Sequence, residues 1–255
     1  MTQEEKELVE QKYARGYARI DLDAVLHNMR HMKAGIDDKT KMIAVIKTDG
    51  YGHGSIPIAD VLEAEEYVWG YAVAAPEEAF LLREHGIRKP ILILGYTFPY
   101  AYERMALEQI RPAVFEREMA AELAKAARKT GKAIKVHIKV DTGMGRIGFF
   151  PSERSAQAIQ SISCLPGLET EGLFTHFANA DDETTEDAEQ QLMRFDRFVQ
   201  DLKTKGLSIP VIHCSNSAAA TRLRKADHDM VRLGISMYGL YPSDYVHDIV
   251  LQPAL

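Results

Sequence analysis

The stretch Met42-Ile-Ala-Val-Ile-Lys47, followed at once by Thr48-Asp-Gly-Tyr-Gly-His-Gly54, carries the information that decides the fold. An uninterrupted apolar run of this length, bounded by a glycine-rich loop, is typical of a strand in a parallel sheet with both faces covered. A lysine that ends such a strand loses hydration, which lowers its pKa and favours the neutral amine. A neutral amine can form a Schiff base with an aldehyde. Lys47 by itself is nevertheless better explained as the point where the strand leaves for solvent.

The loop after Lys47 favours a functional role for the lysine. Its seven residues, Thr48–Gly54, include three glycines, which permit a ligand to approach the backbone closely. Tyr51 can offer its hydroxyl group to a phosphate. An ordinary glycine-rich turn with a buried aromatic ring is the alternative, but a loop of this kind directly after a buried strand is typical of a ligand site.

The order of a short apolar run, a loop and a longer amphipathic segment repeats along the chain. The segments Glu116–Gly131 and Glu186–Gly206 predict long helices, and both end at a glycine, which tolerates the positive φ common beyond a helix C-terminus. Eight strands that alternate with helices predict an α/β protein with a parallel sheet, closed as a (β/α)8 TIM barrel. A doubly wound open sheet has the same periodicity and remains an alternative. The eight predicted strands are Met42–Lys47, Tyr67–Ala74, Ile91–Gly95, Arg111–Phe115, Lys135–Asp141, Leu168–His176, Val211–Cys214 and Met230–Tyr238.

The two ends of the sequence differ from this repeating part. Residues 1–16 are rich in charged and amide side chains and predict an exposed lead-in. Tyr17–Leu22 alternates enough to predict a short strand, and Asp23–Lys33 has helical periodicity. The apolar segment Ile249–Leu255 predicts either the start of another element or a small docked strand. We therefore expect the barrel to occupy residues 17–240.

Composition excludes several classes of function. The chain has 255 residues with a formal charge of −6, which argues against nucleic acid or an anionic membrane as a partner. No apolar stretch approaches the ~20 residues that a membrane-spanning helix needs. The two cysteines, Cys164 and Cys214, lack the spacing of a metal site, so we expect no metal and a reduced, cytoplasmic compartment.

A second candidate cluster ends the fifth predicted strand, in Lys139-Val-Asp-Thr-Gly-Met-Gly-Arg146-Ile-Gly148. Alternation places Lys139 and Asp141 on one side of the strand. A lysine that projects into a barrel is costly unless it is paired, hydrogen-bonded or neutralised. Arg146 stays charged and can donate to a phenolic oxygen or a carboxylate, although a surface arginine explains the residue equally well.

The sixth and seventh strands end in further polar residues. His176 ends the sixth, where a satisfied structural histidine is the commoner explanation. The seventh ends in His213-Cys-Ser-Asn216-Ser217, whose small polar groups at a helix N-terminus suit a phosphate. A simple helix cap by Ser215 or Asn216 explains the same residues.

The eighth strand carries Val231-Arg232-Leu-Gly234-Ile235. Gly234 and Ile235 can present backbone N–H groups to phosphate oxygens. Arg232 beside a pyridine nitrogen would keep that nitrogen unprotonated, because two adjacent positive charges are disfavoured.

Together these motifs resemble the alanine racemase family, the fold-type III enzymes that use pyridoxal 5'-phosphate. The resemblance covers nearly all of the chain after residue 17, with the motifs in the family's order. It rests on Arg19-Ile-Asp-Leu-Asp-Ala24, Ala44–Gly54, Lys139–Gly148, Thr175-His-Phe177, Asn216-Ser-Ala218 and Arg232–Gly239.

The resemblance implies a role for each site residue. Lys47 would hold the cofactor as a Schiff base and act as one of two catalytic bases. Arg232 would contact the pyridine nitrogen with His176 behind it. Arg146 would contact the phenolic oxygen and the substrate carboxylate, and Lys139 matches a position that is often carbamylated. The phosphate end would be formed by Tyr51, Asn216, Ser217, Gly234 and Ile235.

The resemblance also implies a homodimer in which a C-terminal β domain supplies a tyrosine as the second base. From the sequence we expect this domain to be absent, with residues 241–255 as its truncated start, so the second base would be missing. The expected function is interconversion of L- and D-alanine. A stand-alone barrel that binds the cofactor without racemase turnover, and a serine racemase of the same family, are the alternatives. A decarboxylase with the same type of fold fits the lysine segment less well.

Overall fold

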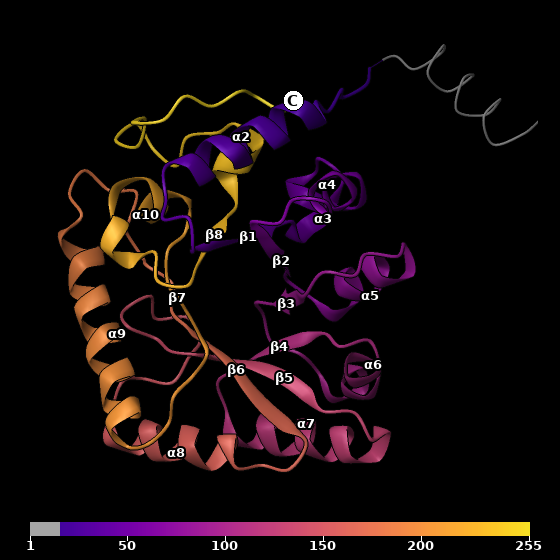
Figure 1. Cartoon of the computed structure of the whole chain (residues 1–255), viewed down its shortest axis with the longest axis vertical. Helices are drawn as coiled ribbons and strands as arrows, with labels where there is room; N and C mark the ends of the chain where they lie inside the picture. The colour runs from indigo at the N-terminus through magenta and orange to yellow at the C-terminus, as the bar shows by residue number, and fades with distance from the viewer. Residues whose placement is uncertain (1–15) are drawn as a thin grey trace, which may run out of the picture.

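A computed structural model describes residues 16–255 as a closed barrel of eight parallel strands surrounded by helices (Figure 1). Strands β1 and β8 pair in parallel, with Lys41 opposite Met230 and Ala44 opposite Leu233, and this pairing closes the sheet. The prediction of a (β/α)8 barrel is confirmed, and the open-sheet alternative is wrong. The strands are β1 Lys41–Val45, β2 Val68–Val73, β3 Ile91–Ile93, β4 Arg111–Val114, β5 Ile134–Lys139, β6 Leu168–Phe174, β7 Val211–His213 and β8 Met230–Leu233.

Helices follow the strands and cover the outside of the barrel (Figure 1). The two long helices predicted from periodicity are present as α7 and α9, and Gly131 and Gly206 lie just beyond them with φ of 68° and 83°. The α-helices are α2 Leu22–Ala34, α3 Lys47–Tyr51, α4 Ser55–Leu62, α5 Pro76–Glu84, α6 Tyr102–Leu107, α7 Arg117–Thr130, α8 Glu153–Ser163, α9 Glu186–Thr204 and α10 Ser217–Arg222. Short 3-10 segments are η1 Pro99–Ala101, η2 Arg224–Ala226 and η3 Ile235–Tyr238.

Several expectations about element boundaries are wrong. Tyr17–Leu22 is not a strand, because Asp21 caps α2 by accepting a hydrogen bond from the amide of Ala24. The eighth strand stops at Leu233, and Ile235–Tyr238 forms η3 instead, because the backbone leaves the extended conformation at Gly234, whose ψ is −100°. The sixth strand ends at Phe174, two residues before His176. The expected lead-in lies outside the described residues, apart from Gly16.

The last described residues pack against α2 without forming a strand. The buried side chain of Asn28 donates to the carbonyl oxygens of Met237 and Gln252 at 3.1 and 2.7 Å. The amide of Asp21 donates to the carbonyl of Ala254 at 2.8 Å. The segment Ile249–Leu255 is therefore docked as irregular chain, and the predicted small docked strand is not formed.

Apolar side chains form two separate clusters. The larger cluster lies between the strands and the helices and includes Met29, Ile58, Leu123 and Phe195. The smaller cluster consists of inward-facing residues, with Trp69 packed against it. The strands also carry buried polar side chains, including His137, Lys139, His213 and Arg232, which provide chemically active groups beside this cluster. The buried members of the smaller cluster are Ile43, Val45, Ala72, Leu92 and Met230.

Two strands carry an extra residue where the pairing register shifts. Between β5 and β6, Val136 pairs with Thr170 but His137 pairs with Gly172, so Glu171 is the extra residue. Between β1 and β2 the register shifts in the same way, and Trp69 is the extra residue. A bulge of this kind redirects a side chain that strict alternation would place on the other face.

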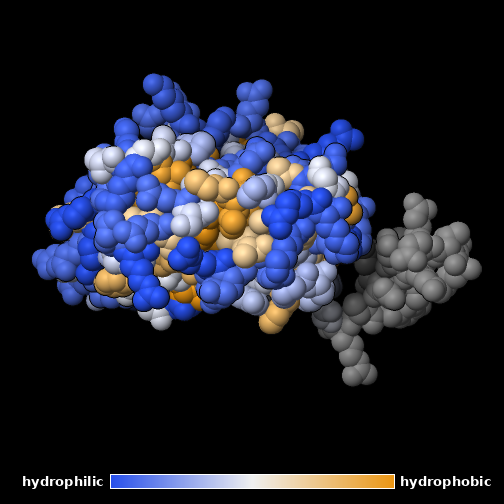
Figure 2. Space-filling view, turned by 90° about the horizontal axis from the view of Figure 1, so that it is seen from below, coloured by the Kyte–Doolittle hydropathy of each residue, from blue (hydrophilic) through white to orange (hydrophobic). Residues whose placement is uncertain are grey.

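The surface is mainly hydrophilic, with some hydrophobic side chains at the centre of the face in Figure 2. None of the helices in residues 16–255 combines the length and apolar character that crossing a bilayer requires.

Candidate active site

A cavity of about 640 Å³ lies at the carboxyl ends of the strands, where barrel enzymes place their sites. It brings together side chains that are spread over most of the sequence. All ten residues singled out from the sequence line it: Lys47, Tyr51, Lys139, Arg146, His176, Asn216, Ser217, Arg232, Gly234 and Ile235.

Lys47 does not end the first strand as the sequence predicts. The strand stops at Val45, and Lys47 begins a turn in which it is partly exposed. The four residues Thr48–Tyr51 all have left-handed backbone, with φ values of 52°, 51°, 61° and 54°. L-residues other than glycine adopt this conformation at a cost, so neighbouring groups have to hold it.

Two carboxylates hold the left-handed turn. Asp49 Oδ1 accepts hydrogen bonds from the amide and hydroxyl groups of Ser55 at 2.8 and 3.1 Å. Glu78 Oε1 accepts from the amide of Thr48 at 2.5 Å. The turn brings Lys47 Nζ to 5.6 Å from the centre of the Tyr51 ring. Lys47 and Tyr51 are therefore positioned together.

The Tyr51 hydroxyl lies next to the loop that follows β8. A Cβ atom on Gly234 would sit only 3.1 Å from that oxygen, so glycine leaves the space open. Ser217 Oγ accepts from the amides of Gly234 and Ser236 at 3.1 and 3.4 Å. The hydroxyl oxygen of Ser236 is buried with no hydrogen-bond partner among the described residues. Hydroxyl and amide groups thus surround one end of the cavity.

Asn216 has the capping role considered from the sequence. Its Oδ1 accepts from the amide of Ala219 at 3.0 Å and caps α10. Ser215 does not cap the helix, because its hydroxyl donates to the carbonyl of Ala226 at 2.9 Å. The cap orients Ser217, the first residue of the helix, toward the amides after β8.

Arg232 is a buried guanidinium on the floor of the cavity, with 3% of its surface exposed. Its Nη2 donates to the carbonyl oxygens of Thr175 and Cys214, both at 2.8 Å, and to His176 Nδ1 at 3.2 Å. Its Nη1 donates to His213 Nδ1 at 2.9 Å. All four acceptors are neutral, so the positive charge of Arg232 is available to a group in the cavity.

His176 accepts a hydrogen bond and is kept neutral. Burial, and then the positive charges of Arg232 and Arg146, lower the pKa of His176 to about 3. A neutral ring can accept from Arg232, whereas a protonated one would repel it. His176 therefore positions Arg232, and general acid catalysis by its imidazolium at neutral pH does not fit this environment.

Lys139 is buried inside the barrel and donates to the carbonyl oxygens of Val140 and Ile147 at 2.8 and 3.2 Å. Burial, followed by the charge of Arg232, lowers the pKa of Lys139 to about 8. Asp141 turns its carboxylate to the amides of Gly143 and Gly145 at 3.0 and 3.1 Å. Lys139 is therefore hydrogen-bonded but has no carboxylate partner within ion-pair distance among residues 16–255.

Sequence reasoning missed several residues of this region. Leu94, Tyr96 and Phe174 line the cavity, and His137 and His213 lie below it. A signal for the histidines was present in the sequence, since both occupy inward positions of strands whose neighbours are apolar. Polar residues at inward positions of a barrel are expensive and mark function.

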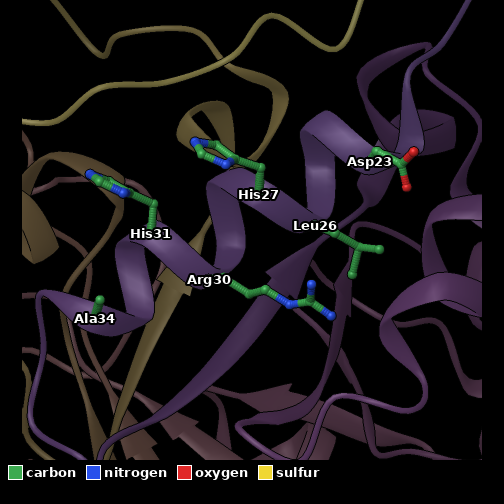
Figure 3. A pocket seen from close by; sticks show the side chains of 6 residues that line it. All are labelled: Asp23, Leu26, His27, Arg30, His31 and Ala34. Carbon is green, nitrogen blue, oxygen red and sulfur yellow. The ribbon is translucent and has the colours of Figure 1, made fainter.

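Another hollow, of about 390 Å³, lies on the outer face of α2 (Figure 3). His27, Arg30 and His31 line it, and their side chains point outward from the barrel. It contains none of the ten candidate site residues, so the cavity at the strand ends is the candidate active site.

Comparison with known proteins identifies the family. Residues 20–242 match the family model described as alanine racemase, N-terminal domain. The chain belongs to the alanine racemase family. The match spans all eight strands of the barrel and every residue of the cavity named above.

Relatives share the sequence as well as the fold. The chain is 41% identical to alanine racemase from Methanococcus maripaludis over 241 residues, 94% of this chain and 64% of that protein. It is similar in structure to alanine racemase from Clostridium difficile 630 in complex with cycloserine, with a TM-score of 0.90 and 39% identity, over 92% of this chain and 65% of the other. Alanine racemase from Bacillus anthracis with bound L-Ala-P gives a TM-score of 0.85 at 34% identity, over 94% and 64% of the two chains. The chain thus spans less than two thirds of these relatives' length.

The cavity fits pyridoxal phosphate, the cofactor that the resemblance implies. The space at Gly234 and the orphan hydroxyl of Ser236 lie at the end lined by amides, where a phosphate needs donors. Arg232 offers a fixed positive charge to a ring nitrogen, and Lys47 offers a primary amine to an aldehyde. The volume is within the usual range of about 300–1,000 Å³ for small-molecule sites.

Proposed function

We propose that this chain binds pyridoxal phosphate through Lys47 and forms the cofactor site of a racemase that interconverts L- and D-alanine. The observation that carries the proposal is the convergence of ten residues from the ends of five strands, β1 and β5 to β8, on one cavity. A single lysine or arginine at a strand end is common in proteins. A primary amine, a buried guanidinium and a group of phosphate donors in one cavity are an uncommon combination. This combination supports a covalently held, anionic cofactor that contains a ring nitrogen.

Each group in the cavity has a distinct task in this proposal. When bound, the cofactor supplies an electron sink for the negative charge left at the α-carbon. Arg232 holds the pyridine nitrogen in its basic form by charge repulsion. Tyr51, Ser217, Gly234 and Ile235 bind the phosphate.

At the substrate end, Arg146 contacts the phenolic oxygen and binds the substrate carboxylate. Lys139 lies close behind it, and carbamylation of its amine would provide Arg146 with an anionic partner. The lowered pKa of Lys139, about 8, supports this modification, because only the neutral amine reacts with carbon dioxide. Mass measurement of the protein in bicarbonate buffer tests it.

Lys47 moves the proton on one face of the α-carbon only. Racemisation removes a proton from one face and returns it to the other, so it needs a second group. Tyr51 lines the same cavity, but burial raises the pKa of its hydroxyl and the ring faces the phosphate end. We therefore propose that a tyrosine outside this cavity lining, supplied across a homodimer, serves the opposite face.

The homodimer has support on the surface of the described part. Phe98, Tyr100 and Phe150 lie beyond the carboxyl ends of β3 and β5 and are 59%, 68% and 71% exposed. Exposed aromatic side chains close to a cavity are common at subunit interfaces. Sedimentation equilibrium of the protein tests the dimer.

We also propose a cytoplasmic location, because Cys164 and Cys214 are both free thiols, as is usual in a reducing compartment.

Two experiments test the proposed function. Reduction of the cofactor-loaded protein with borohydride, followed by peptide mapping, should place the pyridoxyl label on Lys47. A label on Lys139, or no cofactor at saturating concentration, would contradict the proposal. Lys41, the first residue of β1, serves as the internal control because it is an exposed lysine that should remain unlabelled.

The second experiment follows the α-proton. D- and L-alanine are incubated separately in D₂O with this chain and analysed by mass spectrometry. The resemblance assigns Lys47 to the D face, so D-alanine should exchange faster than L-alanine. Exchange of neither amino acid would favour the alternative of a binding barrel without turnover, and faster exchange of serine would favour a serine racemase.

A further inference from the structure

A chain of hydrogen bonds crosses the barrel below the cavity. Arg232 Nη1 donates to His213 Nδ1 at 2.9 Å, and His213 Nε2 lies 2.9 Å from His137 Nδ1. His137 Nε2 lies 3.2 Å from Glu171 Oε2. The four residues come from β8, β7, β5 and β6, and the chain runs from the cavity floor toward the amino-terminal end of the barrel.

The chemistry of the two end groups fixes every proton in this chain. A guanidinium only donates, so His213 accepts at Nδ1 and must carry its proton on Nε2. His137 then accepts at Nδ1 and carries its proton on Nε2, which it donates to the carboxylate of Glu171. Starting from the carboxylate gives the same assignment, because an ionised carboxylate only accepts.

The surroundings keep both rings neutral. His137 and His213 have no exposed surface, and burial lowers the pKa of both. Burial acts against the ionised form of Glu171, but hydrogen bonds from His137 and Arg111 hold its pKa well below the usual range. Arg111 Nε and Lys135 Nζ both lie 3.0 Å from the Glu171 carboxylate. The chain therefore links a carboxylate to a buried guanidinium through two neutral rings.

Local structure is arranged to make room for these side chains. Glu171 is the extra residue at the bulge in β6, which turns it toward His137. A Cβ atom on the next residue, Gly172, would sit 2.3 Å from His137 Nδ1, so only glycine fits there without displacing the ring. Phe174 stacks on His213 with ring centres 4.9 Å apart and an angle of 3°. Each ring is thus held in the orientation that the hydrogen bonds require.

We propose that Glu171 is a positioning residue for Arg232 and acts on it through His137 and His213. The four acceptors that Arg232 contacts directly are neutral, and Glu171 is the carboxylate at the far end of the hydrogen-bond chain. Its negative charge polarises each ring in turn and makes His213 Nδ1 a stronger acceptor for Arg232. The effect of Glu171 on cofactor binding through Arg232 rests on the proposed function, whereas the protonation of His137 and His213 does not.

The first test uses the cofactor-free, unmodified protein. Histidine labelled with ¹⁵N reports which ring nitrogen carries a proton, and contacts with the Trp69 and Phe174 rings assign the signals of His137 and His213. Both rings should be neutral at pH 7, with the proton on Nε2. A proton on Nδ1 of either ring, or a doubly protonated ring, would overturn the inference.

The second test removes the charge and keeps the shape. In Glu171→Gln the ¹⁵N signal of His213 Nδ1 should move toward that of a free, unprotonated imidazole nitrogen, because its bond to Arg232 weakens. The control is Glu65→Gln, since Glu65 pairs with Arg30 at 2.5 Å and its side chain is 16% exposed, against 15% for Glu171. The control should leave His213 unchanged. An unchanged His213 signal in folded Glu171→Gln would also overturn the inference.

The same variants are then loaded with pyridoxal phosphate. Glu171→Gln should bind the cofactor roughly two- to thirtyfold more weakly than Glu65→Gln, the range expected for coupling through a packed network. If Glu171→Gln does not fold, Arg111→Gln replaces it, and the His213 signal should move in the opposite direction because Glu171 loses a competing partner. No shift in Arg111→Gln would count against the inference. Failure of cofactor binding in the unmodified protein would contradict the proposed function but leave the histidine result standing.

Discussion

The two halves of the barrel interior differ in chemistry although they belong to one sheet. Strands β1 to β3 contribute most of the apolar cluster inside the barrel, including Ile43, Ala72 and Leu92, and Met230 of β8 completes it. Strands β5 to β8 contribute buried ionisable groups, including Lys139 and Arg232. Both halves are equally closed to solvent, so burial by itself does not explain the difference.

The two sets of buried side chains differ in what they contribute to the protein: the apolar ones stabilise the fold, and the ionisable ones provide the groups of the site. Each aliphatic side chain that is fully buried contributes about 1.5–3 kcal/mol to folding. A buried polar group with no partner costs roughly 1–3 kcal/mol, and a satisfied one gives a small net gain. The ionisable side chains therefore contribute charges and hydrogen-bond donors rather than folding free energy. The buried apolar side chains supply the folding free energy that offsets the cost of burying them.

Lys47 and Tyr51 are exceptions to this division, because both follow β1 of the apolar half but line the cavity. Lys47→Ala should lower α-proton exchange of D-alanine by about 10²- to 10⁴-fold, the usual contribution of a general base. Its thermal unfolding midpoint should stay close to that of the unmodified protein, because Lys47 is partly exposed. Lys41→Ala is the matched control, and an equal loss of exchange in both variants would disprove the assignment. Mass spectrometry in D₂O and calorimetry measure the two effects.

Leu92→Ala tests the apolar half. Leu92 has no exposed surface, and truncation of such a residue costs about 2–5 kcal/mol of unfolding free energy. The absorption band of the bound cofactor should not change, because Leu92 does not line the cavity. Met193→Ala, at a residue that is 59% exposed, should change stability by less than about 0.5 kcal/mol. A changed cofactor spectrum in Leu92→Ala would show that the two halves are not separate in function.

The pH dependence of stability tests the polar half. Folding lowers the pKa of Lys139 from 10.5 to about 8, so the unfolded chain binds more protons than the folded one between these values. Stability should therefore rise as the pH increases from about 8 to 10.5, by at most about 3 kcal/mol for this group. Lys139→Met should lack this rise. Denaturant unfolding at several pH values, in buffers free of carbon dioxide, measures it, and a parallel rise in Lys139→Met would refute the assignment.

Gly172→Ala tests how tightly the polar half is packed. The added methyl group would collide with the His137 ring, and overpacking of a core costs about 1–3 kcal/mol. Gly131→Ala adds the same group where nothing lies within 4 Å of the new Cβ atom, although its φ of 68° adds backbone strain. Only Gly172→Ala should also alter the histidine ¹⁵N signals. Intact signals in a destabilised Gly172→Ala would show that the His137 ring can move aside.

Much of the barrel was predictable from the sequence because most strands contain a short apolar run between loops, as in β1, β2 and β3. The false strand at Tyr17–Leu22 shows the limit, since six alternating residues say nothing about a pairing partner. Asp21, which caps α2, was the available signal against it. The overlong eighth strand has a related cause, because a buried 3-10 turn is as apolar as a strand.

The site was predictable where chemistry and position coincide, as at Lys47 and Arg232. Glu171 was not predictable, because a bulge shifts the alternation on which inward and outward positions are assigned. The turn after Lys47 was not predictable either. A β-branched residue such as Thr48 rarely has positive φ, and nothing in the neighbouring sequence predicts the left-handed backbone found there.

That turn gives the protein a stretch of mirror-image backbone. Thr48, Asp49 and Tyr51 are L-residues in the conformation natural to D-residues, at a cost of about 1–2 kcal/mol each. In a chain assembled by chemical synthesis, D-amino acids at these positions would favour the same backbone path without that penalty. Ribosomal synthesis cannot make this exchange, so the surrounding hydrogen bonds from Ser55 and Thr48 must enforce the inverted handedness in every molecule that folds.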